Sequence, residues 1–160
     1  MTGKQRFGVF PREVFTSMDG LASLQKMISG ELPAPPICET LGFALTEARP
    51  GEAVFEGAPG YRHYNPIGTV HAGFAATLLD SCVACAVQTT LGLGETYTTL
   101  ELKLNLVRPL TDQTGNVRAE GKVIHRGGTV ATAEGRLIDA KGRLYAHATT
   151  TCMVFPAKPA

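Results

Sequence analysis

The chain has 160 residues, of which 44% are apolar and 18% are charged, and its formal net charge is +1. This length and composition predict one folded domain with a hydrophobic core, and they exclude a disordered chain or a solvated linker. Charges of both signs are interspersed, so the sequence lacks the basic stretch expected of a protein that binds nucleic acid.

The N-terminal sequence lacks the continuous apolar core of a signal peptide, and no stretch reaches the roughly 18 apolar residues of a membrane span. We therefore expect a cytoplasmic protein with no membrane partner. Cys82 and Cys85 have the spacing of a redox or zinc motif, but no second pair of Cys or His follows at ligand spacing. Reduced, packed thiols are the simpler interpretation, and we expect no metal.

The first predicted element is a helix over residues 17–30, in which Leu24 and Ile28 lie on one face. Ser17 can cap the start of this helix, and prolines follow its end. We interpret residues 1–40 as an N-terminal helical extension that precedes the main domain.

Two short strands, at residues 43–47 and 53–57, form a predicted hairpin around a Pro-Gly turn. A polar loop at residues 61–68 leads into a long apolar segment at residues 72–91. This segment contains no proline, and its length favours a helix over a strand. Because it is apolar or small on every side, we expect this helix to be buried.

The last third of the chain has the pattern of strands. Apolar and polar residues alternate from Leu100 to Leu106, which is typical of a half-buried strand. Glycine-bearing turns separate further predicted strands at residues 116–125, 129–138 and 143–155. A long antiparallel sheet and one apolar helix predict an α+β fold in which the sheet wraps around the helix, as in a hotdog fold.

Asp80 is the only Asp, Glu, Lys or Arg between Arg62 and Glu95, and it lies within the apolar helix. Burying a carboxylate without partners is costly or raises its pKa, so this acid should be hydrogen-bonded, exposed to a cleft or used in catalysis. A general base or a nucleophile in an apolar cleft has this character. The alternative is a structural acid that caps the helix or forms a salt bridge.

A loop of small residues leads from Asn65 to the start of the same helix. Free N–H groups at a helix N-terminus, together with the helix dipole, can stabilise a developing oxyanion, and Ala72 and Gly73 would let a carbonyl approach closely. His71 directly precedes them. It is either a participant in catalysis or a partly buried histidine whose ring nitrogens bond the loop backbone.

Nine positions separate His71 from Asp80, which is two and a half helical turns and about 13 Å along the helix axis. The two residues therefore face opposite ways, and one chain cannot easily bring both to one small substrate. Two antiparallel helices in a dimer could do so. We therefore expect a composite site, in which Ala72 and Asn65 of one subunit face Asp80 of the other.

At these residues the sequence resembles the PaaI-like thioesterases of the hotdog superfamily. Their pattern is a polar residue, a short loop, His-Gly-Gly, and an acid nine residues after the histidine, and Asn65, His71 and Asp80 fit this spacing. The resemblance extends over residues 41–156, which we take as the thioesterase domain. The chain departs from the pattern at Ala72, where an alanine keeps the N–H group but requires a negative φ.

The resemblance implies an acyl-CoA thioesterase without a cofactor, in which Asp80 either activates the attacking water or itself attacks the thioester carbonyl. Asn65 would position the water or the carbonyl, and the N–H of Ala72 would contact the oxyanion. Thr99, with Thr98 as the alternative, stands where related enzymes have a hydroxyl that orients the water. Both threonines also suit an ordinary strand.

The resemblance further implies a groove for CoA at the interface of a homodimer, which we expect to pair into a homotetramer. The residues expected to line the groove are Val107, Arg108, Pro109, Arg126, Gly127, Gly128 and Thr129. The two arginines would pair with CoA phosphates through their planar guanidinium groups, unless they are solvated surface residues.

Two other functions remain open at this point. One is a hotdog module that binds acyl-CoA without hydrolysing it, as a sensor or carrier. Asp80 argues against it, because a binding module has little use for a buried acid opposite a helix N-terminus. The other is a dehydratase acting on 2-enoyl thioesters, but that chemistry pairs an Asp with a His near the start of the helix, and Asp80 comes late.

Overall fold

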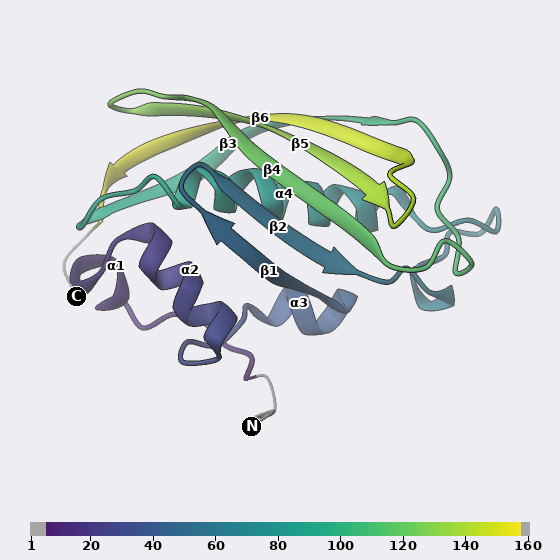
Figure 1. Ribbon diagram of the computed structural model, residues 1–160, viewed down its shortest axis with the longest axis horizontal. Helices are drawn as coiled ribbons and strands as arrows, with labels where there is room; N and C mark the ends of the chain where they lie inside the picture. The colour runs from purple at the N-terminus through teal and green to yellow at the C-terminus, as the bar shows by residue number, and fades with distance from the viewer. Residues whose placement is uncertain (1–5, 158–160) are drawn as a thin grey trace.

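An antiparallel sheet curves around one long helix in the computed structural model, which describes residues 6–157 (Figure 1). The strands are β1 (Phe43–Arg49), β2 (Glu52–Gly57), β3 (Glu95–Leu106), β4 (Val117–Arg126), β5 (Val130–Asp139) and β6 (Leu144–Pro156), in the spatial order β1-β2-β4-β5-β6-β3. The helices are α1 (Val14–Ser17), α2 (Gly20–Ser29), α3 (Pro36–Leu41) and α4 (Ala72–Gln88), with a 3₁₀ turn η1 (Tyr61–His63). The predicted α+β hotdog fold is confirmed.

The helix α4 packs against small side chains of the sheet. In the middle of β4, β5 and β6, the buried residues that face the helix are glycine or alanine: Ala119, Gly121, Ala131, Ala133, Gly135, Ala146 and Ala148. Gly121 pairs with Gly135 across the two strands beneath the middle of the helix. A Cβ on Gly121 would lie 2.2 Å from the carbonyl oxygen of Cys82, so only glycine allows this approach.

The helix itself is buried on most of its surface but not on every side as predicted. Leu78, Leu79 and Val83 are fully buried against the sheet, whereas Asp80 and Gln88 on another face are only half-buried. Within residues 6–157, no helix has the length and hydropathy needed to span a membrane, and α4 is the longest of them.

The helix predicted over residues 17–30 is two helices in the structure. Ser17 ends α1, and α2 begins after Asp19, whose carboxylate accepts a hydrogen bond from the Ala22 N–H at 2.7 Å. The backbone at Met18 is extended between them, so the carboxylate, and not the Ser17 hydroxyl, caps the longer helix.

One helix was not predicted, and one further boundary differs from the prediction. The helix α3 begins at Pro36, because the first helical position needs no N–H and suits the fixed φ of proline. The helix α4 ends at Gln88, three residues earlier than expected. Here the hydroxyls of Thr89 and Thr90 donate to the carbonyls of Ala86 and Val87, at 2.6 and 2.7 Å, and so compete with continuation of the helix.

The strand β3 forms one edge of the sheet, next to β6, and is less buried than the alternation of its leucines predicted. Leu100 is 58% exposed and Leu106 is 52% exposed, because a bulge between Thr99 and Glu101 shifts the register and no strand covers the outer edge within residues 6–157. A twelve-residue edge strand with exposed leucines offers an edge on which another strand can pair.

We predict that Gly121→Ala destabilises the fold by about 3 kcal/mol, because its methyl group would push the α4 backbone away from the sheet. Urea unfolding monitored by circular dichroism measures the effect. Gly60→Ala is the matched control: a Cβ there meets nothing within 4 Å, so a change within about 0.5 kcal/mol is expected. If the two variants were equally stable, α4 would not pack in close contact with the glycine pair.

Candidate active site

The start of α4 is capped by His71. The ring Nδ1 of His71 accepts the Gly73 N–H at 2.9 Å, and its carbonyl accepts the Phe74 N–H at 3.0 Å. His71 is therefore occupied as a cap, in line with the structural interpretation of this histidine. The Ala72 N–H finds no acceptor within residues 6–157 and opens from the helix N-terminus. Ala72 has a negative φ, as its N–H contact requires, since every positive φ described belongs to glycine.

The loop before the helix is held by Asn65 and by His63. The Asn65 Oδ1 accepts the N–H groups of Ile67 and Thr69 at 3.1 and 3.2 Å, and its Nδ2 donates to the Thr69 hydroxyl at 3.0 Å. The His63 carbonyl accepts the His71 N–H at 2.7 Å. The His63 ring stacks on Phe74, with centroids 4.5 Å apart. The loop thus reaches the helix in one fixed conformation.

Asn65, His71 and Ala72 line one side of a pocket of about 320 Å³. The segment Val107-Arg108-Pro109 lines the other side, together with Tyr145. The Tyr145 carbonyl accepts the N–H groups of Val107 and Arg108 at 2.9 and 3.1 Å, and the Arg108 guanidinium lies 5.7 Å from the centre of the tyrosine ring. This pocket, called the loop pocket below, can hold a carbonyl oxygen at the helix N-terminus and an anionic group near Arg108.

Asp80 lies in a different pocket, of about 450 Å³, called the Asp80 pocket below. Burial raises the pKa of the Asp80 carboxyl above its ordinary value of 3.8, and a hydrogen bond from the Thr99 side chain partly opposes this shift. Thr98 points to the outer face of the sheet and is exposed. Of the two threonines predicted at this position, Thr99 is therefore the one beside the acid.

The two pockets share no residue. Ala72 and Asp80 sit on the same helix but open onto different spaces, and so do His71 and Asp80, which the count of helical turns placed on opposite faces. Within one chain, no small substrate can touch both groups.

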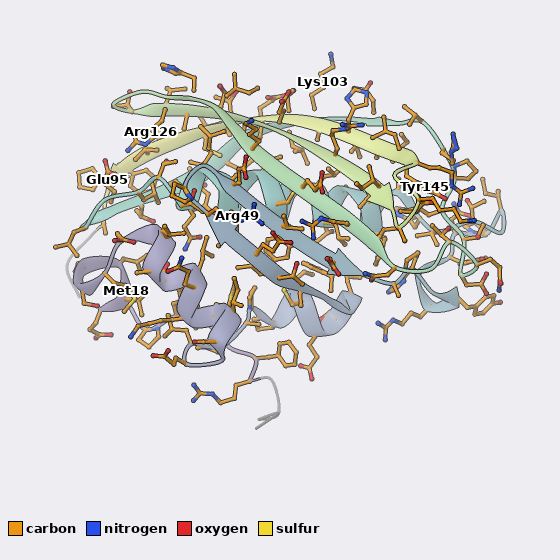
Figure 2. All side chains as sticks on the ribbon, in the orientation of Figure 1. Met18, Arg49, Glu95, Lys103, Arg126 and Tyr145 are labelled. Carbon is orange, nitrogen blue, oxygen red and sulfur yellow. The ribbon has the colours of Figure 1, made fainter. Side chains whose placement is uncertain are left out.

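The Arg126 turn lies far from the loop pocket. Figure 2 shows Arg126 beside Glu95 at one end of the sheet and Tyr145 at the other. The guanidinium of Arg126 binds both carboxylate oxygens of Glu95, at 2.8 and 2.9 Å, and also the carbonyl of Gly127. One chain therefore does not bring the turn Arg126 to Thr129 next to Arg108.

Cys82 and Cys85 have different surroundings. The Cys82 thiol donates to the Leu79 carbonyl at 3.2 Å beneath the helix, whereas Cys85 lines the Asp80 pocket. Burial raises the pKa of both thiols, and that of Cys85 to about 12, so both are protonated at neutral pH. Residues 6–157 contain no group of three His, Cys, Asp or Glu side chains placed to hold a metal ion.

Comparison with known proteins identifies the family. The sequence model of the thioesterase superfamily matches residues 67–146, half of the chain. The chain belongs to the thioesterase superfamily. The matched region includes His71, Ala72, Asp80 and Thr99, and it leaves out the first 66 residues.

The chain is similar in fold to three solved structures, at different levels of sequence identity. A phenylacetic acid degradation-related protein from Ralstonia eutropha JMP134 is 32% identical, with a TM-score of 0.73 over 81% of this chain and 98% of that one. A variant of the phenylacetic acid degradation protein PaaI from Thermus thermophilus is 31% identical, with a TM-score of 0.67 over 74% and 97%. The PaaI protein of Escherichia coli has a TM-score of 0.74 over 87% and 96% but only 15% identity, so it supports the fold alone.

The resemblance to PaaI-like thioesterases is confirmed by these relatives. None of the curated protein sequences matches the chain.

Sequence reasoning left open that residues 1–40 cover the acyl pocket or an interface, but several residues of the Asp80 pocket were not among the predicted site residues. They come from the N-terminal extension and from α2: Val9, Phe10, Phe15, Leu24 and Met27. The predicted first helix has an apolar face, which indicated that it packs against another part of the protein. The sequence did not show that the covered surface includes Asp80.

We predict that Asp80→Asn raises the melting temperature at neutral pH. A carboxyl whose folded pKa is raised opposes folding once the pH exceeds that pKa, whereas below the unfolded pKa both states hold the proton. The gain over wild type should therefore shrink as the pH falls toward 3. Thermal unfolding of both proteins across this pH range measures it.

Asp139→Asn is the control of opposite sign. Burial disfavours ionisation of Asp139, but hydrogen bonds from Arg143 and Lys141 outweigh it and hold the pKa of this carboxyl at about 2. This variant should lose stability at neutral pH, with the loss fading as the pH falls through the folded pKa. Destabilisation by Asp80→Asn at neutral pH would mean that Asp80 is a structural acid.

Proposed function

We propose that the protein is an acyl-CoA thioesterase of the cytoplasm, with a hydrolytic site that is shared between two subunits. The observation that carries this proposal is the position of the two reactive groups of α4. Ala72 presents a free N–H in the loop pocket, and Asp80 presents a carboxyl of raised pKa in the other pocket. The four cysteines are free thiols, as is usual in a reducing compartment.

In the proposed reaction, water attacks the thioester carbonyl, a C–O bond forms, the C–S bond breaks, and the CoA sulfur leaves with a proton. Asp80 either takes the proton from the water or attacks the carbonyl itself and is regenerated by water. Burial makes this carboxylate more basic, and the Thr99 hydroxyl beside it can orient the water. The Ala72 N–H and the α4 dipole would stabilise the oxyanion.

A second subunit would bring the two pockets together. The long apolar edge of β3 supports antiparallel pairing with β3 of another copy about a twofold axis. Such pairing sets the two α4 helices antiparallel, so that Ala72 of one subunit approaches Asp80 of the other. The Arg126 turn of one subunit would likewise approach Arg108 of its partner. Pairing of two such dimers would give the expected homotetramer.

We predict that Asp80→Ala lowers kcat/KM for acyl-CoA by at least about a hundredfold, the usual size of a general-base contribution. The measurement is thiol release from a panel of acyl-CoAs. Glu134→Ala removes an exposed acid from the outer face of β5 and is the matched control, with wild-type activity expected. If the wild type binds CoA thioesters but hydrolyses none of them, a binding module becomes the better description.

A second prediction concerns the Ala72 N–H. Ala72→Pro removes only this donor, because proline suits the first helical position and the ψ of 139° at His71 suits a residue before proline. We expect kcat to fall by about a hundredfold or more. Ala72→Gly keeps the N–H and should retain far more activity than the proline variant.

Mixed dimers of Ala72→Pro and Asp80→Asn chains then test the sharing. Each mixed dimer contains one intact site, so a co-refolded equal mixture should recover about a quarter of wild-type activity. Both parent variants serve as the inactive references. Absence of recovery in a mixture shown to contain mixed dimers would overturn a site shared between the two subunits.

A further inference from the structure

We propose that the N-terminal arm, defined as residues 8–15, forms a wall of the acyl-binding pocket, and that Phe10 restricts the space available to a straight, uncharged acyl chain. This inference rests on the proposed thioesterase function, and it deepens that proposal by naming the acyl group. The family model begins at residue 67, so the arm is an addition of this chain to the matched region.

One side of the Asp80 pocket is a single face of α4. Asp80, Ala84 and Gln88 are spaced four residues apart and line the pocket in a row about 12 Å long. Asp80 marks the end at which the thioester carbonyl would react. The row therefore leads from the carbonyl carbon along the helix, and Ala84 leaves space one turn beyond the acid.

The opposite side is built by the N-terminal extension. Phe10 and Phe15 come from the arm, and Leu24 and Met27 from α2. The two phenylalanine rings are in contact, with centroids 6.3 Å apart. Asp80 is the only charged side chain among the residues that line the pocket, so its walls suit an alkyl chain and disfavour a second carboxylate.

Backbone hydrogen bonds hold the arm at both ends. The Gly8 N–H donates to the Ala34 carbonyl at 2.9 Å, and the Phe15 carbonyl accepts the Gly94 N–H at 3.1 Å, just before β3. The wall is thus fixed between the segment after α2 and the start of β3.

Polar side chains line the far end of the row. The Gln88 Nε2 donates to the Ser23 hydroxyl at 3.0 Å, and Tyr97 lies beside it in the same pocket. A methyl terminus that reached these groups would gain nothing by growing longer, because further carbons would displace a hydrogen-bonded amide. The geometry therefore points to acyl chains of medium length, with an optimum between hexanoyl and dodecanoyl.

The test uses S-alkyl-CoA thioethers, which have the CoA and the alkyl chain but no carbonyl to hydrolyse, with chains from ethyl to tetradecyl. Calorimetric titration of the wild type should show affinity rising about fourfold per methylene up to the medium-length optimum and then falling. Phe10→Ala should weaken binding of the optimal thioether about tenfold and shift the optimum to longer chains. Ala84→Leu should shift it to shorter ones.

Phe7→Ala is the matched control, because Phe7 is on the neighbouring segment but does not line the pocket. Its profile should equal that of the wild type. Each variant is first shown to keep the wild-type melting temperature within a few degrees and the wild-type oligomeric state, and Phe15→Ala replaces Phe10→Ala if the latter fails this check.

The outcomes separate the inference from the proposed function. An affinity that does not depend on chain length, or a profile that Phe10→Ala and Ala84→Leu leave unchanged, overturns the inference even if the wild type hydrolyses acyl-CoA. Shifted thioether profiles in a protein that hydrolyses no thioester overturn the thioesterase proposal but support the alkyl-binding pocket. An absence of thioether binding at every chain length overturns both.

Discussion

The close contact between α4 and the sheet is the constraint on which the rest of the structure depends. Gly121 and Gly135 are paired and are surrounded by alanines. The backbone of α4 therefore packs so closely against the strands that no space remains for a methyl group on Gly121. This contact fixes the rotation of the helix about its axis. Once Leu79 and Val83 face the sheet, Asp80 must open to one side and Ala72 to another.

Because Ala72 and Asp80 open onto different pockets, one chain cannot combine them, and the exposed edge of β3 is the place where a second chain could pair. An isolated chain would carry a strand with one unpaired edge and exposed leucines, a free N–H at the start of α4, and an acid in an apolar pocket, as far as residues 6–157 show. Each of these is unfavourable by itself. One symmetric pairing of two chains would relieve the first and combine the other two in a single site, so the features are mutually consistent.

Much of this arrangement could be predicted from the sequence. The alternation of strand residues and the length of the apolar segment were sufficient for the fold, and helical periodicity alone placed His71, the residue before Ala72, opposite Asp80. The bulge at Thr99 could not be predicted, since the leucine alternation continues through it. Capping was also misjudged, because Ser17 and Asp19 are both good caps and only the backbone at Met18 decides between them. The pairing of Arg126 with Glu95 joins residues far apart in the chain, and no local pattern reveals such a contact.

The one departure from the family pattern, alanine in place of glycine at residue 72, also affects the unfolded chain. Alanine samples fewer backbone conformations than glycine before folding, so at a position with negative φ it stabilises the native state by about 0.4 to 1 kcal/mol. Its methyl group lies at the exposed helix start and excludes nothing from the backbone. The alanine thus lowers the entropy that is lost on folding at the residue that presents this N–H group, and it does so without removing the donor.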